Sequence, residues 1–256
     1  MTGQTRPAPH NLRLRMRNRE SLRGTFVKIP HPQVVELLGA EGIDFLVLDA
    51  EHAAFDIQAL DSCIMAARTW SVPALVRVPS IDSPLIAAVL DMGAQGILLP
   101  HVSTVAAAEE GLRAALYHGG ERGLTGSSRS GDYGGNASLD AYTRRADSEV
   151  VIIAQLEDCE ALEHIGQMAK LDRVDGFFIG AADLGLSLAN SGPDAPTLND
   201  AMEQLITTVA AAGRPLGTYV DRIDQAAKHA AQGYHFLAIG SDQTMIRRAA
   251  SAIKMA

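Results

Sequence analysis

The chain has 256 residues, of which 47% are hydrophobic and 20% charged, a composition typical of a globular domain with a substantial core. Its formal net charge of −8 argues against a nucleic-acid-binding surface, which needs clustered lysine and arginine. No run approaches the roughly 18 consecutive apolar residues that a membrane span requires, so we expect neither nucleic acid nor a membrane as a partner.

The N-terminal segment combines a short tail with a basic stretch. Residues 1–10 are expected to form a flexible tail, and NLRLRMRNRESLRG (11–24) to contribute an extra amphipathic helix. This stretch lacks the apolar core of a signal peptide. Cys63 and Cys159 have no CxxC spacing, so packed thiols are favoured over a disulfide or a metal site. Together these features favour a cytoplasmic location.

Eight short apolar runs follow, and each is typical of a parallel strand covered on both faces because its apolar character is continuous. In chain order they are TFVKI (25–29), FLVLD (45–49), ALVRV (74–78), GILLP (96–100), VVIIAQLE (150–157), GFFIG (176–180), PLGTYV (215–220) and FLAIG (236–240). Helical patterns separate them, and a final helix over 241–256 closes the chain. Most of these patterns stop at a glycine suited to the left-handed C-terminal cap, and several open at a typical N-cap residue. The glycines are Gly42, Gly93, Gly119, Gly213 and Gly233, and the N-caps are Asp56, Ser83, Thr104 and Asn199.

This alternation predicts an α/β fold, a single (β/α)8 barrel domain over residues 1–256. The main alternative is a doubly wound open sheet, but no GxGxxG follows the first run and no GxxxxGK[ST] is present. The stretch GGERGLTGSSRSGDYGGNAS (119–138) is long for a loop in a compact domain. Its glycines match no phosphate-loop spacing, so an ordered surface or subunit-contact loop is favoured.

Polar side chains gather where the predicted strands end, and in such barrels the chemistry lies at these carboxyl ends. Glu157 and Asp183 are one strand–helix unit apart, so they are expected on adjacent strands, where they could share Mg²⁺ or Mn²⁺. Taken alone, Asp183 could cap a short helix and Glu157 could be an exposed acid. Arg77 could likewise be an ordinary ion-pair partner within the barrel.

The second strand is followed by DAEHAAFD (49–56). A carboxylate that orients an imidazole is a common way to fix a general base, so Asp49 and His52 together are a candidate acid–base pair. Asp56 is expected to cap the next helix, and Glu51 has no assigned role. His101 is interpreted as an ordinary polar residue, without a catalytic or metal-binding role.

Five collinear motifs resemble the HpcH/HpaI aldolase family, the class II pyruvate aldolases of the phosphoenolpyruvate/pyruvate barrel superfamily. They are GIDFLVLDAEHAAFD (42–56), LVRVP (75–79), LDMGAQGILLPHVST (90–104), AQLEDCEAL (154–162) and VDGFFIGAADLGLSLA (174–189). The resemblance implies a (β/α)8 TIM barrel whose last helix is exchanged between subunits, with dimers assembled into a homohexamer as a trimer of dimers. It also implies a place in aromatic compound catabolism.

The resemblance further implies reversible cleavage of a 4-hydroxy-2-oxo acid to pyruvate and an aldehyde, with Mg²⁺, Mn²⁺ or Co²⁺ and no organic cofactor. By position, the metal ligands would be Glu157 and Asp183, with Gln155 beside them. Arg77 would stabilise the enolate, and His52, oriented by Asp49, would be the base. Gly180 and Ala181 would hold the pyruvate carboxylate through their amides, and Asp91 would approach the active site of a neighbouring subunit.

Two segments depart from the family pattern. The sequence GAADLGLS replaces a usual Gly-Pro-x-Asp-Leu-Ser, and YHGGERG keeps Tyr117, Arg122 and Gly123 of a usually proline-rich segment. A Schiff-base aldolase is not predicted, because Lys28 belongs to the first predicted strand and has no supporting pocket motif. The remaining alternatives are an oxaloacetate decarboxylase, a carbon–carbon lyase for longer or CoA-linked acids, and a non-catalytic barrel that binds an oxo acid.

Overall fold

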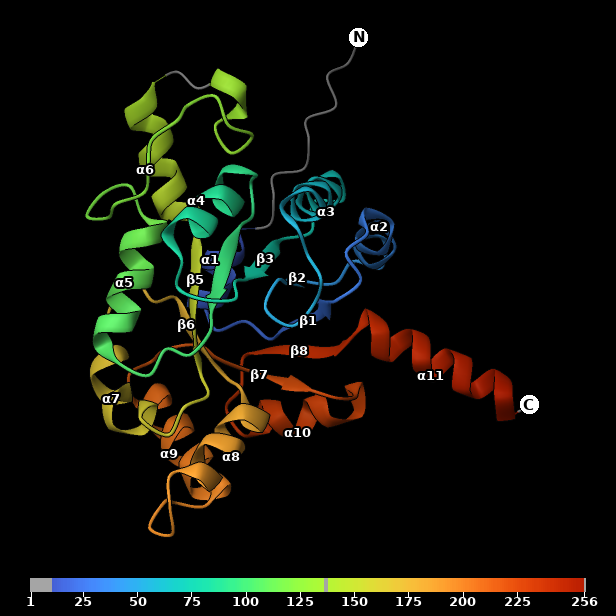
Figure 1. Ribbon diagram of the computed structural model, residues 1–256, viewed down its shortest axis with the longest axis vertical. Coiled ribbons are helices and arrows are strands. Elements are labelled where there is room, and N and C mark those ends of the chain that lie inside the picture. The colour runs from blue at the N-terminus through green and yellow to red at the C-terminus, as the bar shows by residue number, and fades with distance from the viewer. Residues whose placement is uncertain (1–10, 136–137, 256) are drawn as a thin grey trace.

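The protein forms a closed barrel of eight parallel strands in sequential order, as predicted (Figure 1). The computed structural model describes residues 11–135 and 138–255, so the expected tail at 1–10 lies outside the described residues. The strands are β1 (Leu22–Val27), β2 (Phe45–Asp49), β3 (Ala74–Arg77), β4 (Gly96–Leu99), β5 (Val151–Leu156), β6 (Gly176–Ile179), β7 (Leu216–Val220) and β8 (Phe236–Ser241).

Helices cover the outside of this barrel. Those between strands are α2 (Pro32–Ala40), α3 (Ile57–Thr69), α4 (Ser83–Asp91), α5 (Val105–Ala115), α6 (Leu139–Glu149), α7 (Ala161–Met168), α8 (Ala181–Asn190), α9 (Leu198–Ala211) and α10 (Ala226–Ala231). Asp56 and Thr104 cap helices as expected, whereas α4 begins after Asp82 and α9 is capped by Thr197 rather than Asn199. All five predicted C-terminal glycines have positive φ.

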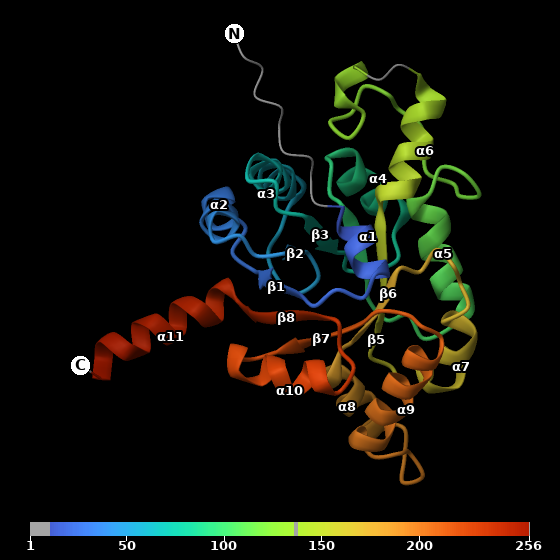
Figure 2. The same ribbon diagram turned by 180° about the vertical axis from the view of Figure 1, so that it is seen from behind.

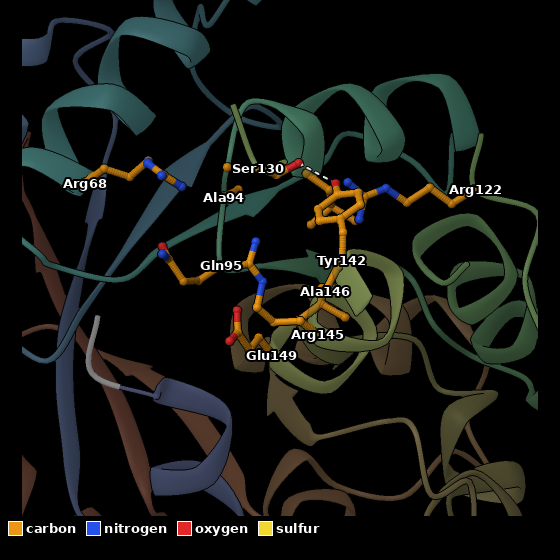
Figure 3. A pocket seen from close by; sticks show the side chains of 12 residues that line it. Arg68, Ala94, Gln95, Arg122, Ser130, Tyr142, Arg145, Ala146 and Glu149 are labelled. Atoms are coloured by element: carbon orange, nitrogen blue, oxygen red, sulfur yellow. Dashed lines mark hydrogen bonds between the residues drawn. The ribbon is translucent and has the colours of Figure 1, made fainter. Parts of the chain in front are cut away.

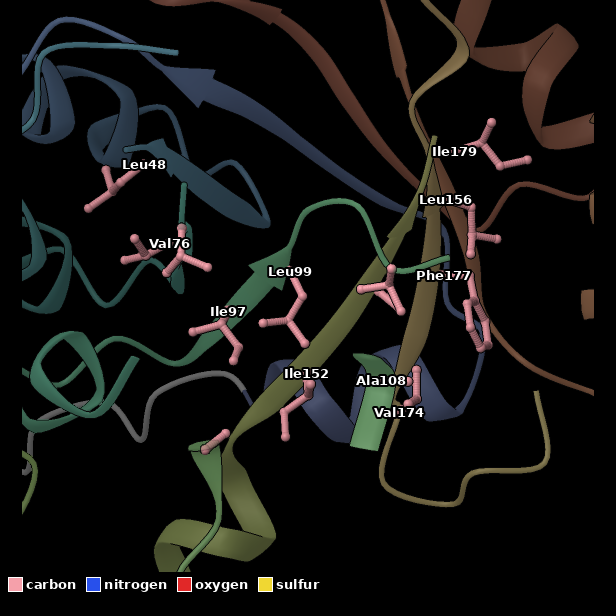
Figure 4. Packing of buried hydrophobic residues seen from close by; sticks show 14 of the residues in the cluster. Leu48, Val76, Ile97, Leu99, Ala108, Ile152, Leu156, Val174, Phe177 and Ile179 are labelled. Carbon is pink, nitrogen blue, oxygen red and sulfur yellow. The ribbon is translucent and has the colours of Figure 1, made fainter. Parts of the chain in front are cut away.

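Residues alternate between two cores along each strand. Side chains such as Leu48, Val76 and Ile152 face outward and pack in the layer beneath the helices (Figure 4). The intervening residues, such as Val47 and Leu75, fill the barrel interior. Because successive side chains of a strand point to opposite faces, this alternation directs every second residue at the strand ends into the barrel.

A short helix, α1 (Leu12–Arg17), closes the amino-terminal end of the barrel. Leu12 and Met16 are buried in the interior core, and Arg13 Nε donates to the buried carboxylate of Asp175 at 2.8 Å. Figure 2 shows this helix in front of the strands when the molecule is viewed from behind. The predicted extra N-terminal helix is therefore confirmed, and it leaves the carboxyl ends of the strands as the open end.

The last helix, α11 (Asp242–Met255), extends away from the barrel wall (Figure 1). Met245, Ile246 and Ile253 on this helix are exposed, Ile253 to 79%. Within the described residues, no helix is both long enough and apolar enough to span a bilayer.

Candidate active site

A cavity of about 370 Å³ opens at the carboxyl ends of the strands. We call it the carboxyl-end cavity. Six residues predicted from the sequence line it: His52, Arg77, Gln155, Gly180, Ala181 and Asp183. The other lining residues are Phe26, Lys28, Phe178, Ala182, Tyr219, Ser241, Gln243 and Thr244. The barrel therefore brings together side chains from most of its strands.

Asp49 and Arg77 form the most deeply buried charged pair of this region. Arg77 Nε donates to Asp49 Oδ1 at 2.9 Å and Nη2 donates to Oδ2 at 2.8 Å. Asp49 is fully buried, and burial alone would raise the pKa of its carboxyl. The hydrogen bonds and charge of Arg77, with smaller contributions from the His52 N–H and Lys28, outweigh burial and leave that pKa below its usual value.

The contact between Asp49 and His52 differs from the expected one. Asp49 Oδ1 accepts the backbone N–H of His52 at 3.2 Å, so the carboxylate fixes the turn rather than the imidazole. The ring of His52 is 53% exposed, and its Nε2 lies 3.7 Å from Glu51 Oε2. In this structure, therefore, the acid beside the imidazole is Glu51, a residue with no role predicted from the sequence.

Glu51 also lies beside the guanidinium of Arg77, with 3.2 Å between its Oε2 and Arg77 Nη1. Burial raises the pKa of the Glu51 carboxyl and the nearby Glu157 adds to the effect, against the opposing charges of Arg77, His52 and His101. Arg77 thus joins two carboxylates, and its planar fork is held from two sides.

Glu157 is presented by the end of β5 and is almost fully buried. Its Oε1 accepts the backbone N–H of His101 at 2.8 Å, and its Oε2 accepts from Gln155 Nε2. His101 has a φ of 52°, a left-handed conformation that is uncommon outside glycine. This backbone geometry directs the His101 N–H at the carboxylate.

Glu51, His101 and Glu157 converge on one point, since their ligand atoms lie within 4.8 Å of one another. Within the described part of the chain, Glu51 Oε2 and Gln155 Oε1 are buried without a hydrogen-bond partner. Buried acceptors are normally satisfied, so these two call for a donor or a cation. Carboxylate, amide and imidazole donors in this arrangement fit a hard divalent cation such as Mg²⁺ or Mn²⁺.

Asp183 lies in the first turn of α8 and lines the same cavity. It does not cap the helix, because Gly180 is the N-cap and makes no side-chain cap bond. A Cβ at Gly180 would lie 2.8 Å from Glu157 Oε2, so only glycine leaves room for that carboxylate. Asp183 and Glu157 therefore both border the cavity at its β5–β6 side.

The predicted carboxylate-binding amides need one correction. The N–H of Gly180 donates to the carbonyl of Leu156 at 3.1 Å, so it is not available to a ligand. The amides that follow it, starting with Ala181, lie in the first turn of α8, where the N–H groups have no acceptor within the helix. A carboxylate at this end of the cavity would also be stabilised by the helix dipole.

Lys28 is a further cavity residue that the sequence analysis set aside. It follows β1 directly rather than lying within the strand, and its Nζ is 3.2 Å from Asp49 Oδ2. The ammonium group therefore lines the cavity as part of an ion pair. Its distance from Asp49 depends on the pairing of β1 with β2, which the local sequence does not reveal.

Asp91 lies at the other end of the barrel, where α4 stops before β4 begins. Its Oδ1 accepts from Arg122 Nη2 at 2.6 Å. Arg122 borders a separate cavity of about 90 Å³, in which the hydroxyls of Ser130 and Tyr142 are 2.8 Å apart (Figure 3). Within this chain, Asp91 is therefore not part of the carboxyl-end cavity.

Comparison with known proteins gives consistent matches over nearly the whole chain. The family model described as HpcH/HpaI aldolase/citrate lyase matches residues 23–249. A 4-hydroxy-2-oxovalerate aldolase of Rhodococcus jostii (strain RHA1) is 36% identical over 223 residues, which cover 85% of this chain and 84% of the relative. A hydroxypyruvate/pyruvate aldolase of Pseudomonas aeruginosa is 32% identical over 236 residues, covering 91% and 87%. A crystal structure of a family protein from Burkholderia cenocepacia J2315 superposes with a TM-score of 0.88 at 26% identity, covering 95% of this chain and 97% of that one.

Proposed function

The chain belongs to the HpcH/HpaI aldolase/citrate lyase family, and from this we propose that it is a class II aldolase that reversibly cleaves a 4-hydroxy-2-oxo acid to pyruvate and an aldehyde. The observation that carries the proposal is the meeting of a buried carboxylate cluster, a fixed arginine and an exposed histidine around one cavity. These groups are what proton removal next to a ketone requires: a base, and positive charge where the enolate forms.

We assign the pyruvate half to the β5–β6 side of the carboxyl-end cavity. Glu157 and Asp183 would hold a divalent cation, and Gln155 Oε1 is a buried acceptor beside it. When bound, Mg²⁺ or Mn²⁺ would supply Lewis-acid polarisation of the oxo acid. The amide of Ala181 and its successors in the first turn of α8 would receive the carboxylate of the oxo acid.

Arg77 would stabilise the developing enolate oxygen. Two of its nitrogens are committed to Asp49 and a third lies beside Glu51, which leaves N–H groups on Nη1 and Nη2 for the substrate. Because both carboxylates hold the guanidinium in place, little reorganisation is needed as charge develops. Asp49 thereby acts on catalysis through the position of Arg77.

His52 would be the general base that removes a proton from the pyruvate methyl group, or that accepts the proton of the 4-hydroxyl in the cleavage direction. Its ring is exposed at the edge of the cavity and free to meet a substrate. The nearby Glu51 carboxylate would stabilise the protonated imidazole.

We further propose that the enzyme acts in the cytoplasm as a homo-oligomer in which α11 docks on a neighbouring subunit. The exposed Met245, Ile246 and Ile253 on an extended helix support this proposal, because such side chains favour burial. Asp91 would then act, if at all, on a neighbouring site.

Exchange of the pyruvate methyl protons in D₂O, followed by NMR, tests the proposed function without knowledge of the aldehyde. We expect exchange with Mn²⁺ or Mg²⁺, no exchange with a chelator, and loss of exchange in His52→Ala. His31→Ala, at the N-cap of α2, is the matched histidine control and should exchange normally. Absence of exchange in the unmodified protein with every divalent metal would contradict the aldolase proposal and favour a CoA-linked lyase or a binding-only barrel.

A further inference from the structure

We propose that Lys28 selects the aldehyde: the second substrate carries a carboxylate on a short aliphatic chain, and the Lys28 ammonium binds it. This inference rests on the proposed aldolase function and names the aldehyde class for the same site.

The position of Lys28 separates it from the pyruvate half. In the closed barrel, β1 and β8 are neighbours and lie across the ring from β5 and β6. Gln155 and Asp183 belong to the β5–β6 side, whereas Lys28 follows β1. The cavity is also larger than pyruvate needs. At about 30 Å³ per water-sized group, its 370 Å³ holds about a dozen non-hydrogen atoms, and pyruvate has six.

The charge of the cavity favours an anion beside Lys28. Among the described lining residues, the lysine and arginine side chains are Lys28 and Arg77. Arg77 is held by Asp49 and Glu51. Asp49 already receives two hydrogen bonds from Arg77, so its contact with the Lys28 Nζ at 3.2 Å satisfies one of three ammonium donors. The side chain of Lys28 is 27% exposed, which leaves the remaining donors accessible from the cavity.

The surroundings of Lys28 define the rest of the ligand. Phe26, Phe178 and Tyr219 supply an aromatic wall that suits a short aliphatic chain. On the opposite side, the Thr244 hydroxyl is already bonded to the Ser241 backbone. Within the described residues the Gln243 side chain makes no hydrogen bond, so it could also contact a carboxylate.

The backbone fixes where the Lys28 side chain starts. Its N–H is 3.0 Å from both oxygens of the buried Asp242, and the Ile29 N–H donates to the same carboxylate at 2.8 Å. The stem of Lys28 therefore leaves a rigid point at the end of β1, which is a requirement for a selective contact.

The test compares two aldehydes of equal length, succinic semialdehyde and butanal, as acceptors for pyruvate. We expect the unmodified enzyme to prefer the charged aldehyde in kcat/KM, and the preference to weaken at high salt. In Lys28→Met, the ratio of the two kcat/KM values should fall at least about tenfold, as expected when a charged hydrogen bond is lost. Lys28→Arg should retain most of the preference, and Lys170→Met, an exposed lysine beyond α7, is the matched control.

The outcomes separate the two proposals. If Lys28→Met slows both aldehydes equally, Lys28 only supports Asp49 and the inference is wrong. If the variant does not fold, the unmodified enzyme still decides, because absence of a salt-sensitive preference for the charged aldehyde overturns the inference. Failure of the unmodified enzyme to exchange pyruvate protons would instead overturn the aldolase function on which it rests.

Discussion

Asp49 and Arg77 meet through two hydrogen bonds, one from Nε and one from Nη2 of the guanidinium, at 2.9 and 2.8 Å. The two residues end neighbouring strands and are directly paired in the register of β2 with β3. Parallel pairing of these strands, rather than proximity in sequence, therefore builds the cationic side of the site.

Arg77→Lys should lower the metal-dependent pyruvate exchange rate about 10²- to 10³-fold, the usual loss for one preorganised donor. Lysine keeps the charge but cannot reach Asp49 through two nitrogens and still present donors to a substrate. NMR in D₂O gives the rate, and thermal unfolding shows whether the variant is folded. An exchange rate within twofold of the unmodified enzyme would remove Arg77 from the proposed mechanism.

Glu157→Gln should weaken Mn²⁺ binding by at least about 100-fold, since even groups that only support metal ligands contribute 10- to 100-fold. Electron paramagnetic resonance of free Mn²⁺ measures this affinity without any substrate. Glu160→Gln is the control, because Glu160 lies three residues on at the exposed start of α7 and accepts from Ser103. Equal affinities in the two variants would place the cation elsewhere.

Met16→Ala should lower the free energy of unfolding by about 2–5 kcal/mol, because the side chain is buried in the interior core at the closed end of the barrel. Leu14→Ala on the same helix should change it by less than about 0.5 kcal/mol, since Leu14 is 55% exposed. Urea unfolding compares the two variants. Similar losses would mean that α1 does not close the barrel in solution.

The two cysteines should differ in reactivity. Cys63 is buried, and burial together with the charge of Asp242 raises the pKa of its thiol to about 12. Cys159 is only partly buried. Because the thiolate is the reactive form, a disulfide reagent at pH 8 should modify Cys159 in the folded protein and Cys63 only after denaturation. Mass spectrometry of tryptic peptides identifies the modified thiol, and rapid labelling of Cys63 would contradict its burial.

The barrel could be predicted from sequence because continuous apolar runs and glycine-terminated helices are local signals. All eight strands lie where predicted, although β1 begins and ends earlier than TFVKI suggests. Helix α6 was missed because its exposed, charged sequence LDAYTRRADSE buries little beyond Tyr142 and Thr143. Without an apolar stripe, a helix of this kind has no periodic signal.

The site was predictable only in part. Residues such as Arg77 and Gln155 stand in the interior register of their strands, so they could be identified from strand ends alone. The convergence of Glu51, His101 and Glu157 follows the second, fourth and fifth strands and depends on barrel closure. The contact of Asp49 with the backbone of His52 depends on turn geometry, which the residue types do not specify.

The carboxylate of Asp242 binds the backbone after β1 and also starts α11, the helix that extends away from the barrel. One side chain thus links the segment proposed to contact a neighbouring subunit with the segment that carries Lys28. Any rotation of α11 on assembly would be transmitted to the ammonium group through these short hydrogen bonds. Substrate choice and quaternary structure are therefore mechanically coupled in this chain, and an isolated subunit would select its aldehyde differently from an assembled one.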